Sequence, residues 1–504
     1  MISNNNIFNS NILLIYKFNI VSDIAFMLPE IFIFISLMLV VFYSSFYSNF
    51  AIYKYIKLSL SLLNLISLVI IIYILLVLNS VCYENIISSY LLYNNMPILF
   101  IKILLSVLSL IIIKISYSYM VLKNLNFFEF YLFVFISLIA LLLLVMAYDF
   151  ILAYLAIELQ GLCSYVLVAM NKSYNKSIES SLKYFVLGSF ASSILLLGIS
   201  LLYWSTGMTN FKDISDLMQL SFNLEFFNNI FLLGLTLIHI GIFFKLSVAP
   251  FHLWLPDIFY GSSKVVVLLF SLLPKLSLIV VLFKLNFLFM LKINWDFKAF
   301  YLYFVLLSLI FGIAGALKVE KLNKLIAYSS ISHMGFLLCS VLSYNFEIFL
   351  LYIIIYSLIS LSIFIVLFNL INPLSGKTFS SLYQLSYIKK INYILFISLV
   401  ISFFSISGIP PLSGFFSKFF IFLSLINLNL NLLVLILLLF SVVSCFYYLR
   451  IIKIISFNNV RNWYLLTDLT KLSSYMLSLH ILVNVFLFLN IPIIWESVQW
   501  ILPL

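Results

Sequence analysis

Long, nearly uninterrupted runs of apolar residues recur along most of this chain, and they constrain its fold more than any other feature. A helix needs roughly 20 mostly apolar residues to cross the hydrocarbon core of a bilayer, and about fourteen runs reach that length. Residues of the set AVILMFWYC make up 65% of the 504 residues, whereas charged residues make up only 9%. So few charges cannot cover a folded surface in water. The sequence therefore predicts an all-α, polytopic membrane protein with about 14 transmembrane helices.

Short polar segments separate these helices, and none is long enough for a soluble domain. The longest connections, 205–226 and 371–391, are expected to be loops, and the first 25 residues show no signal-peptide pattern. The predicted helices are 26–47, 57–80, 98–122, 127–147, 149–170, 180–204, 227–250, 262–287, 300–318, 322–344, 346–370, 392–424, 427–454 and 474–497.

Lysine and arginine residues are distributed unevenly between the two sets of loops. Of 20 loop cations, 16 follow odd-numbered helices, among them Lys264 after the seventh, and 4 follow even-numbered helices. Because loops rich in Lys and Arg stay on the cytoplasmic side of a membrane, the odd-numbered loops are expected to face the cytoplasm or an organelle matrix. The net charge of +11 is therefore assigned to membrane topology, and no nucleic-acid partner is expected.

Ionisable residues stand inside several predicted helices, where each costs roughly 2.5–3.5 kcal/mol and usually marks an ion or proton pathway. Three of them lie beside a proline, which frees a backbone carbonyl and is tolerated in a membrane only inside protein or beside water. A buried lysine that alternates between being paired with an acid and being separated from it can change its protonation state near physiological pH. We therefore expect a proton relay, with Glu158 and Lys245 as its first pair. The candidates are Glu158, Lys183, Lys245, Lys275, His333 and Lys418.

Two of the proline breaks stand five helices apart, each beside a lysine. One is at Pro250 in the seventh predicted helix, and the other is at 408–411 in the twelfth, where Gly414 is expected to leave room for water beside Lys418. Broken helices in corresponding positions suggest repeats, and a five-helix unit has odd parity, so its second copy would be inverted. The predicted parts are an N-terminal extension at 1–25, three leading helices at 26–122, repeats at 127–287 and 300–454, and a C-terminal helix at 474–504.

A purely structural interpretation stays open for most of these residues. Lys183 lies close enough to its helix end for its ammonium group to reach the interface. Ion pairs alone would explain the lysines beside prolines, and His333 and His239 would serve equally as hydrogen-bonded core residues. Outside the candidate relay, Lys102, Lys114 and Lys284 are expected to extend to the interface, and Glu30 and Glu129 to be capping or interface acids.

Redox chemistry has no recognisable site in this sequence. The chain has no G-x-G-x-x-G dinucleotide motif, and its four cysteines, at 82, 163, 339 and 445, are scattered without a C-x-x-C. We therefore expect this chain to bind no metal and no cofactor.

Four sequence segments match motifs of a known protein family: FFKLSVAPFHLWLPD at 243–257, LLPKLSLI at 272–279, LIAYSSISHMGFLL at 325–338 and GIPPLSGFFSKFFIF at 408–422. They resemble the antiporter-like subunits of proton-pumping NADH:ubiquinone oxidoreductase, respiratory complex I. The first and last strings also resemble multisubunit sodium/proton antiporters. IELQGLCSYVL at 157–167 and the segment 182–211 are similar to subunit 2 of complex I, and the resemblance extends from about residue 26 to 455.

That resemblance implies fourteen helices, two inverted five-helix repeats, and broken seventh and twelfth helices. One departure is YGSSKVVV at 260–267, which lacks the family's usual proline and leaves the geometry entering the eighth helix open. Residue by residue, Glu158 resembles the family's acidic partner on the fifth helix, and Lys245 resembles its lysine on the seventh. Lys183 resembles a lysine of the sixth helix, and Lys275 resembles the central lysine of the eighth. His333 resembles a histidine on the axis between the two halves, and Lys418 resembles the terminal lysine of the twelfth helix.

The same resemblance implies the partners. NADH, FMN, iron–sulfur clusters and ubiquinone would bind to other subunits, and this chain would contribute proton movement coupled to their electron transfer. Its partners would be the other membrane-arm subunits and bilayer lipids, including cardiolipin, in the mitochondrial inner membrane or, alternatively, a bacterial plasma membrane. Two competing hypotheses remain: a subunit of a cation/proton antiporter, and a structural assembly subunit with no proton path.

Overall fold

The structure is a computed structural model of the chain, and its described part is almost entirely helical. The predicted all-α membrane class is confirmed. Of the predicted N-terminal extension, residues 1–19 lie outside the described residues, and 20–25 already belong to the first described helix. The described residues are 20–48, 53–80, 91–123, 125–172, 174–220, 225–290, 297–371, 379–458 and 470–487.

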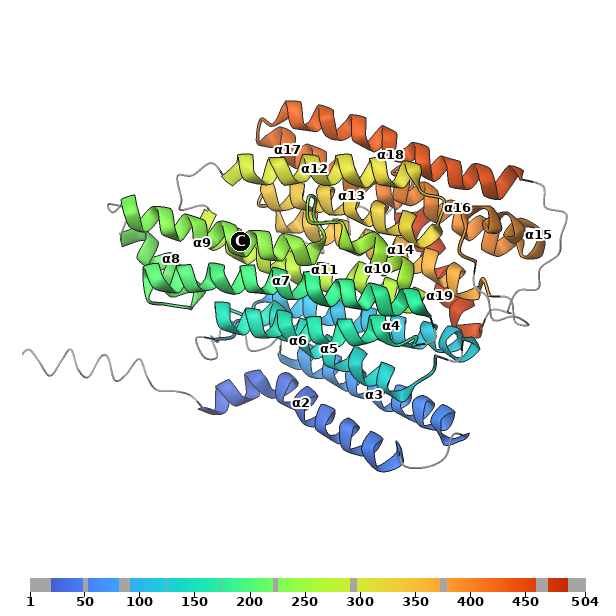
Figure 1. Ribbon diagram of the computed structural model, residues 1–504, viewed down its shortest axis with the longest axis horizontal. Coiled ribbons are helices and arrows are strands. Elements are labelled where there is room, and N and C mark those ends of the chain that lie inside the picture. The colour runs from blue at the N-terminus through green and yellow to red at the C-terminus, as the bar shows by residue number, and fades with distance from the viewer. Residues whose placement is uncertain are drawn as a thin grey trace, which may run out of the picture.

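Twelve helices within these residues are long and apolar enough to cross a membrane. They are α2 (Ile20–Ser48), α3 (Tyr53–Ser80), α4 (Met96–Leu122), α5 (Phe128–Met146), α6 (Phe150–Ala169), α7 (Asn175–Thr206), α9 (Glu225–Leu246), α11 (Lys264–Leu285), α12 (Phe297–Lys318), α13 (Leu322–Leu342), α14 (Phe346–Asn369) and α18 (Asn431–Phe457). Most run nearly parallel to one another, with α2 and α3 at one edge of the molecule and α18 at the opposite edge (Figure 1).

Two helices replace the single long run predicted at 392–424. α16 (Tyr393–Ser407) ends at Gly408, whose positive φ of 87° terminates the helix, and α17 (Ser413–Asn427) begins after the two prolines. A comparable interruption follows α9, where Ser247 has a φ of 60° and the chain resumes as the short helix α10 (Trp254–Gly261). Both expected breaks are therefore present. The count of fourteen helices and the repeat relationship stay predictions.

The two long connections contain helices that the sequence analysis did not predict. In the segment 205–226, α8 (Phe211–Leu220) forms because Phe211 and Ile214 are buried on one side of it. In the segment 371–391, a 3₁₀ helix, η2 (Leu382–Tyr387), leads into α15 (Ile388–Ile391). The remaining elements are a π-helical turn, η1 (Asn286–Met290), and α19 (Lys471–Phe486), while residues 488–504 of the predicted C-terminal helix lie outside the described residues.

Polar side chains fix several helix starts. The Asp149 carboxylate accepts the backbone N–H of Ile151 at 2.7 Å at the start of α6, and Asn392 accepts from the first turn of α16. Such caps satisfy backbone N–H groups that have no partner inside the helix. α11 begins at Lys264 after the extended residue Ser263, so a regular helix forms although the family's usual proline is missing there.

The core of the bundle is centred on α11, α13 and α14, whose residues are almost all buried. α11 packs against α4, α5 and α9 from the earlier part of the chain and against α13 and α14 from the later part. In contrast, α7 and α18 expose large apolar side chains, as expected for helices that face lipid or a partner subunit. Groups carried by α11 are therefore placed between the two halves of the molecule.

Candidate functional site

Lys245 lies in the last turn of α9, and its ammonium group is directed toward α6. Its Nζ atom is 4.0 Å from Oε1 of Glu158, and the Lys245 side chain is 4% exposed while that of Glu158 is 25% exposed. The ammonium group also donates to the Tyr165 hydroxyl at 3.4 Å. Gly161 lies beside this contact, and a Cβ atom at that position would make only an ordinary contact of 3.5 Å with Nζ. The structure thus brings together the pair that the sequence predicted.

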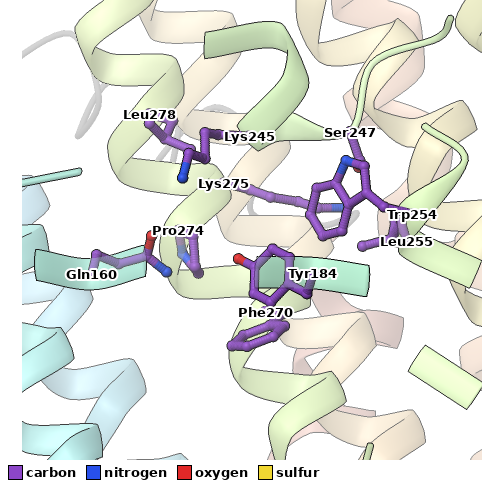
Figure 2. A pocket seen from close by; sticks show the side chains of 10 residues that line it. All are labelled: Gln160, Tyr184, Lys245, Ser247, Trp254, Leu255, Phe270, Pro274, Lys275 and Leu278. Atoms are coloured by element: carbon purple, nitrogen blue, oxygen red, sulfur yellow. The ribbon is translucent and has the colours of Figure 1, made fainter. Parts of the chain in front are cut away.

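A cavity of about 20 Å³ joins Lys245 to Lys275, and this volume is enough for a water molecule. Gln160 from α6 and Tyr184 from α7 converge on the same space, as Figure 2 shows. Within the described part of the chain, the Lys275 ammonium group has no hydrogen-bond partner. A buried ammonium group without a protein acceptor is costly, so this cavity is well suited to hold a water that accepts from it.

A neighbouring cavity of about 10 Å³ continues from Gln160 and Pro274 toward α5, where Ser137 and Ser164 line it. The two cavities share Gln160, whose amide both donates and accepts hydrogen bonds. The polar lining of this region therefore extends from α5 through α6 to the lysines of α9 and α11.

Lys418 lies in α17, and its ammonium group is hydrogen-bonded to the backbone at the helix break rather than paired with a carboxylate. Its ammonium group donates to the Ser407 carbonyl at 2.8 Å, and it stands 5.3 Å from the centre of the Phe336 ring. No described carboxylate lies within ion-pairing distance of Lys418. The carbonyl that the broken helix leaves free is thus satisfied by the lysine itself. Gly414 lines the cavity beside Lys418, where the sequence predicted room for water. It also serves close helix packing, because a Cβ atom there would lie 1.7 Å from the Ser405 carbonyl oxygen.

His333 lies in α13, which packs against both α11, the helix of Lys275, and α17, the helix of Lys418. It shares a cavity of about 10 Å³ with Lys418. Its Nδ1 atom is 2.7 Å from the Tyr352 hydroxyl, and its Nε2 atom is 3.2 Å from the Tyr448 hydroxyl. A neutral imidazole donates from one nitrogen and accepts at the other, so His333 can connect two hydroxyl groups on opposite sides of its ring.

Lys183 is the one candidate that the structure does not place with the others. Its side chain is 46% exposed, and it pairs with Glu179 at 2.7 Å and with Asp257 at 3.4 Å at one end of the bundle. This position agrees with the alternative that its ammonium group reaches the interface. Its membership of the relay stays a prediction.

The expectation that Lys102 extends to the interface is wrong. Lys102 in α4 is fully buried and pairs with Glu30 of α2 at 2.7 Å, with side-chain exposures of 1% and 7%. Lys284 is also partly buried, and it donates to the Val145 and Ala147 carbonyls at the end of α5. Lys264, which the sequence analysis counted as a loop cation, is buried and donates to the Leu367 carbonyl at 3.0 Å. In each case a distant segment supplies the acceptor, which no local sequence pattern reveals.

The remaining candidates have local structural roles. His239 is fully buried, with Nδ1 2.8 Å from the Leu235 carbonyl oxygen and Nε2 3.3 Å from the Asn286 side-chain oxygen, which fits a core histidine. Lys114 and Glu129 are exposed. Among the described residues, no group of three or more His, Cys, Asp or Glu side chains is arranged to hold a metal ion, and Cys82 lies outside them.

Residues 147–444 match the family described as NADH:quinone oxidoreductase/Mrp antiporter, transmembrane, and this range holds all six candidate residues. The chain belongs to this family. Within it, the chain is 33% identical to the NADH-ubiquinone oxidoreductase chain 2 of Marchantia polymorpha, over 93% of this chain and 96% of that protein. It is 38% identical to the NADH-quinone oxidoreductase subunit N of a Wolbachia strain, over 62% of this chain and 67% of that protein.

Solved structures of two kinds of complex share the antiporter-like fold. A chain of respiratory complex I from Thermus thermophilus superposes with a TM-score of 0.75 at 22% identity, covering 92% of this chain and 99% of that chain. A chain of the Mrp complex from Dietzia sp. superposes with a TM-score of 0.78 at 15% identity, covering 95% and 97%. The fold alone therefore fits both a complex I subunit and an antiporter subunit.

Proposed function

We propose that this chain is a proton-translocating membrane-arm subunit of respiratory NADH:quinone oxidoreductase, complex I. The observation that carries the proposal is the pair of buried lysines, Lys245 and Lys275, on one water-sized cavity beside Glu158. Intramembrane ionisable groups around a hydrated space are the usual components of proton pathways.

The alternative of a cation/proton antiporter subunit is supported by the fold of the Mrp complex. The curated relatives favour complex I, because the similarity to an NADH-ubiquinone oxidoreductase chain 2 extends over nearly the whole of both chains. We assign NADH, FMN, iron–sulfur clusters and ubiquinone to partner subunits. We place the chain in the mitochondrial inner membrane, or alternatively a bacterial plasma membrane, among other membrane-arm subunits and lipids that include cardiolipin.

The proposed relay runs from Glu158 and Lys245 through Lys275 and His333 to Lys418. Glu158 and Lys245 together are neutral when both are ionised, whereas Lys275 and Lys418 have no described carboxylate partner. Two such cations, on helices that both pack against α13, repel each other, and this repulsion is strong where water is scarce. Charging one lysine thus disfavours the charge on the other, which couples their protonation.

Lys418 is the proposed exit of this relay. Its ammonium group already has an acceptor in the Ser407 carbonyl, so it is held in place whether or not it carries the proton. In the predicted topology, α17 leads away from the side of the odd-numbered loops, and release from Lys418 would be outward. The two predicted repeats, 127–287 and 300–454, would then each supply one half of the path.

The experiment is a Lys275→Met substitution in the native complex, with Lys114→Met as the matched control at an exposed lysine outside the cavities. We expect Lys275→Met to leave an assembled complex in which NADH:quinone reductase activity and proton pumping both fall, and Lys114→Met to change neither. An assembled Lys275→Met complex with normal turnover and pumping would favour a structural assembly subunit. If the native complex is isolated and contains no electron-transfer subunits, and if it catalyses sodium/proton exchange, the chain is an antiporter subunit.

A further inference from the structure

A cluster of charged groups surrounds Tyr260 at the end of the bundle where α7 and α13 begin. The Tyr260 hydroxyl accepts from the Lys176 ammonium group at 2.7 Å and from the Lys321 ammonium group at 3.0 Å. The ammonium groups of Lys176, Lys321 and Lys324 stand 4.6, 4.2 and 5.4 Å from the centre of its ring. A hydroxyl that accepts from two ammonium groups is stabilised in its ionised, phenolate form.

The carboxylates of the cluster form ion pairs with Lys183 and Lys324. Asp257, on the same helix as Tyr260, accepts from Lys324 at 3.1 Å and from Lys183 at 3.4 Å, and Glu179 pairs with Lys183. Partial burial alone would raise the pKa of Asp257, but these lysines lower it below its ordinary value. Asp257 therefore stays ionised at neutral pH.

Tyr260 is the member of the cluster whose pKa is lowered toward neutral pH. The hydrogen bond from Lys176, followed by that from Lys321, lowers the pKa of Tyr260 to about 8. Tyr174, at the start of α7, also faces Lys176. Because the folded pKa lies below that of an ordinary phenol, the hydroxyl is mostly protonated at pH 7 and mostly ionised at pH 9.

α10 connects this cluster to the buried cavity. Its first residues, Trp254 and Leu255, line the cavity of Lys245 and Lys275. Tyr260 follows Trp254 by six residues, about 9 Å along the helix axis. It is half-buried, whereas Lys176 and Lys321 are exposed. The helix thus has one end at the relay and the other at a titratable group that reaches the surface.

We propose that Tyr260 is a proton-exchanging site that takes up protons from the water beside the odd-numbered loops and supplies them to the relay. The phenolate oxygen takes a proton from the aqueous phase and forms an O–H bond. That bond breaks again when the proton passes to water on the side of the cavity, and no electron moves. This inference rests on the proposed relay function and names the group through which the relay is loaded.

Ionisation of Tyr260 is measured first, on the assembled complex. Tetranitromethane nitrates the phenolate form of tyrosine, so nitration of the peptide that carries Tyr260 is followed by mass spectrometry as a function of pH. We expect half-maximal nitration near pH 8, and a shift of the midpoint to about pH 10, the ordinary phenol value, in the Lys176→Met, Lys321→Met double variant. A wild-type midpoint at the ordinary phenol value would overturn the inference.

Proton uptake is measured next with Tyr260→Phe, which keeps the ring under the ammonium groups and removes only the hydroxyl. General acid–base groups act best when their pKa lies near the working pH. We therefore expect turnover and pumping at pH 8.5 to fall at least about threefold, and to change little at pH 6.5. A merely structural role would lower activity equally at every pH, and an unchanged pH profile would also overturn the inference. If Tyr260→Phe does not assemble, the pH profile of the lysine double variant decides in the same way.

The outcomes separate this inference from the function on which it rests. A normal pH profile in Tyr260→Phe, combined with loss of pumping in Lys275→Met, removes Tyr260 and leaves the relay in place. Normal pumping in an assembled Lys275→Met complex removes the relay itself, whatever the nitration midpoint.

Discussion

Two lysine–glutamate pairs join different helices in the described part of this protein, and they differ in their distance and surroundings. Glu30 and Lys102 are 2.7 Å apart with both side chains buried. Glu158 and Lys245 are 4.0 Å apart, Glu158 is partly exposed, and Lys245 faces a cavity that it shares with Lys275. The short pair is suited to holding helices together, whereas the long pair beside a cavity that can hold a water is suited to exchanging a proton. We therefore expect the distance and the cavity, rather than the residue types, to distinguish a structural pair from a functional one.

The largest expected effect is on stability, from Glu30→Gln. Removing one partner of a buried ion pair leaves the other charge uncompensated, which costs about 3–5 kcal/mol. We expect the variant subunit to fall steeply in abundance in the membrane, and any complex that assembles to have a lower thermal midpoint. The control is the Glu30→Gln, Lys102→Met double variant, which removes both charges and should recover most of the loss. Should Glu30→Gln instead assemble normally and slow proton pumping alone, the two pairs would not differ as proposed.

Lys418→Met tests whether a lysine held by a carbonyl serves the same relay as one held by a carboxylate. Methionine keeps an unbranched apolar stem that fits the same space, so assembly should be preserved. A positioned proton-transfer group commonly contributes 10²–10⁴-fold, and we expect turnover and pumping to fall together by at least about tenfold. Quinone reductase activity and the proton-to-electron ratio are the readouts. Normal values for both in an assembled complex would remove Lys418 from the relay.

Gly161→Ala and Gly414→Ala compare the space around the two lysines. A Cβ atom at Gly161 makes only ordinary contacts of 3.5 Å, whereas one at Gly414 would lie 1.7 Å from the Ser405 carbonyl oxygen. Overpacking of this kind typically costs about 1–3 kcal/mol, so we expect Gly414→Ala to lower the thermal midpoint of the complex and Gly161→Ala to leave it almost unchanged. Equal midpoints for the two variants would show that α17 does not pack closely against α16.

The smallest expected effect is that of Tyr165→Phe. The Tyr165 hydroxyl accepts from Lys245 at the long distance of 3.4 Å, and a hydrogen bond of this kind contributes about 0.5–1.5 kcal/mol. We expect pumping to slow by no more than about tenfold and assembly to be unchanged. A loss as complete as that of Lys245→Met would mean that the tyrosine, and not Glu158, is the principal partner of the lysine.

The sequence was sufficient to predict the fold class and the position of the lysine sites. Long apolar runs predict membrane helices, and a proline near a lysine marks a break at Lys245 and Lys418 but not at Lys275, where α11 continues through Pro274. The sequence predicted the pairing of Glu158 with Lys245 but not that of Glu30 with Lys102. Glu30 and Lys102 are 72 residues apart, and helical periodicity reveals which face a residue occupies but not which helix covers that face. For the same reason Lys264 was taken for a loop cation, although α14 buries it.

The most direct test of the relay is a double-mutant cycle on proton pumping with Glu158→Gln, Lys245→Met and the double variant, each in the assembled complex. Two charges 4 Å apart interact by roughly 4 kcal/mol at an effective dielectric of 20, and the partial exposure of Glu158 reduces this through solvent screening. The account predicts that the two effects are strongly non-additive, with a coupling of about 1–3 kcal/mol in the pumping rate. Effects that simply add would mean that Glu158 and Lys245 do not act as one unit, and would contradict the proposed entry into the relay.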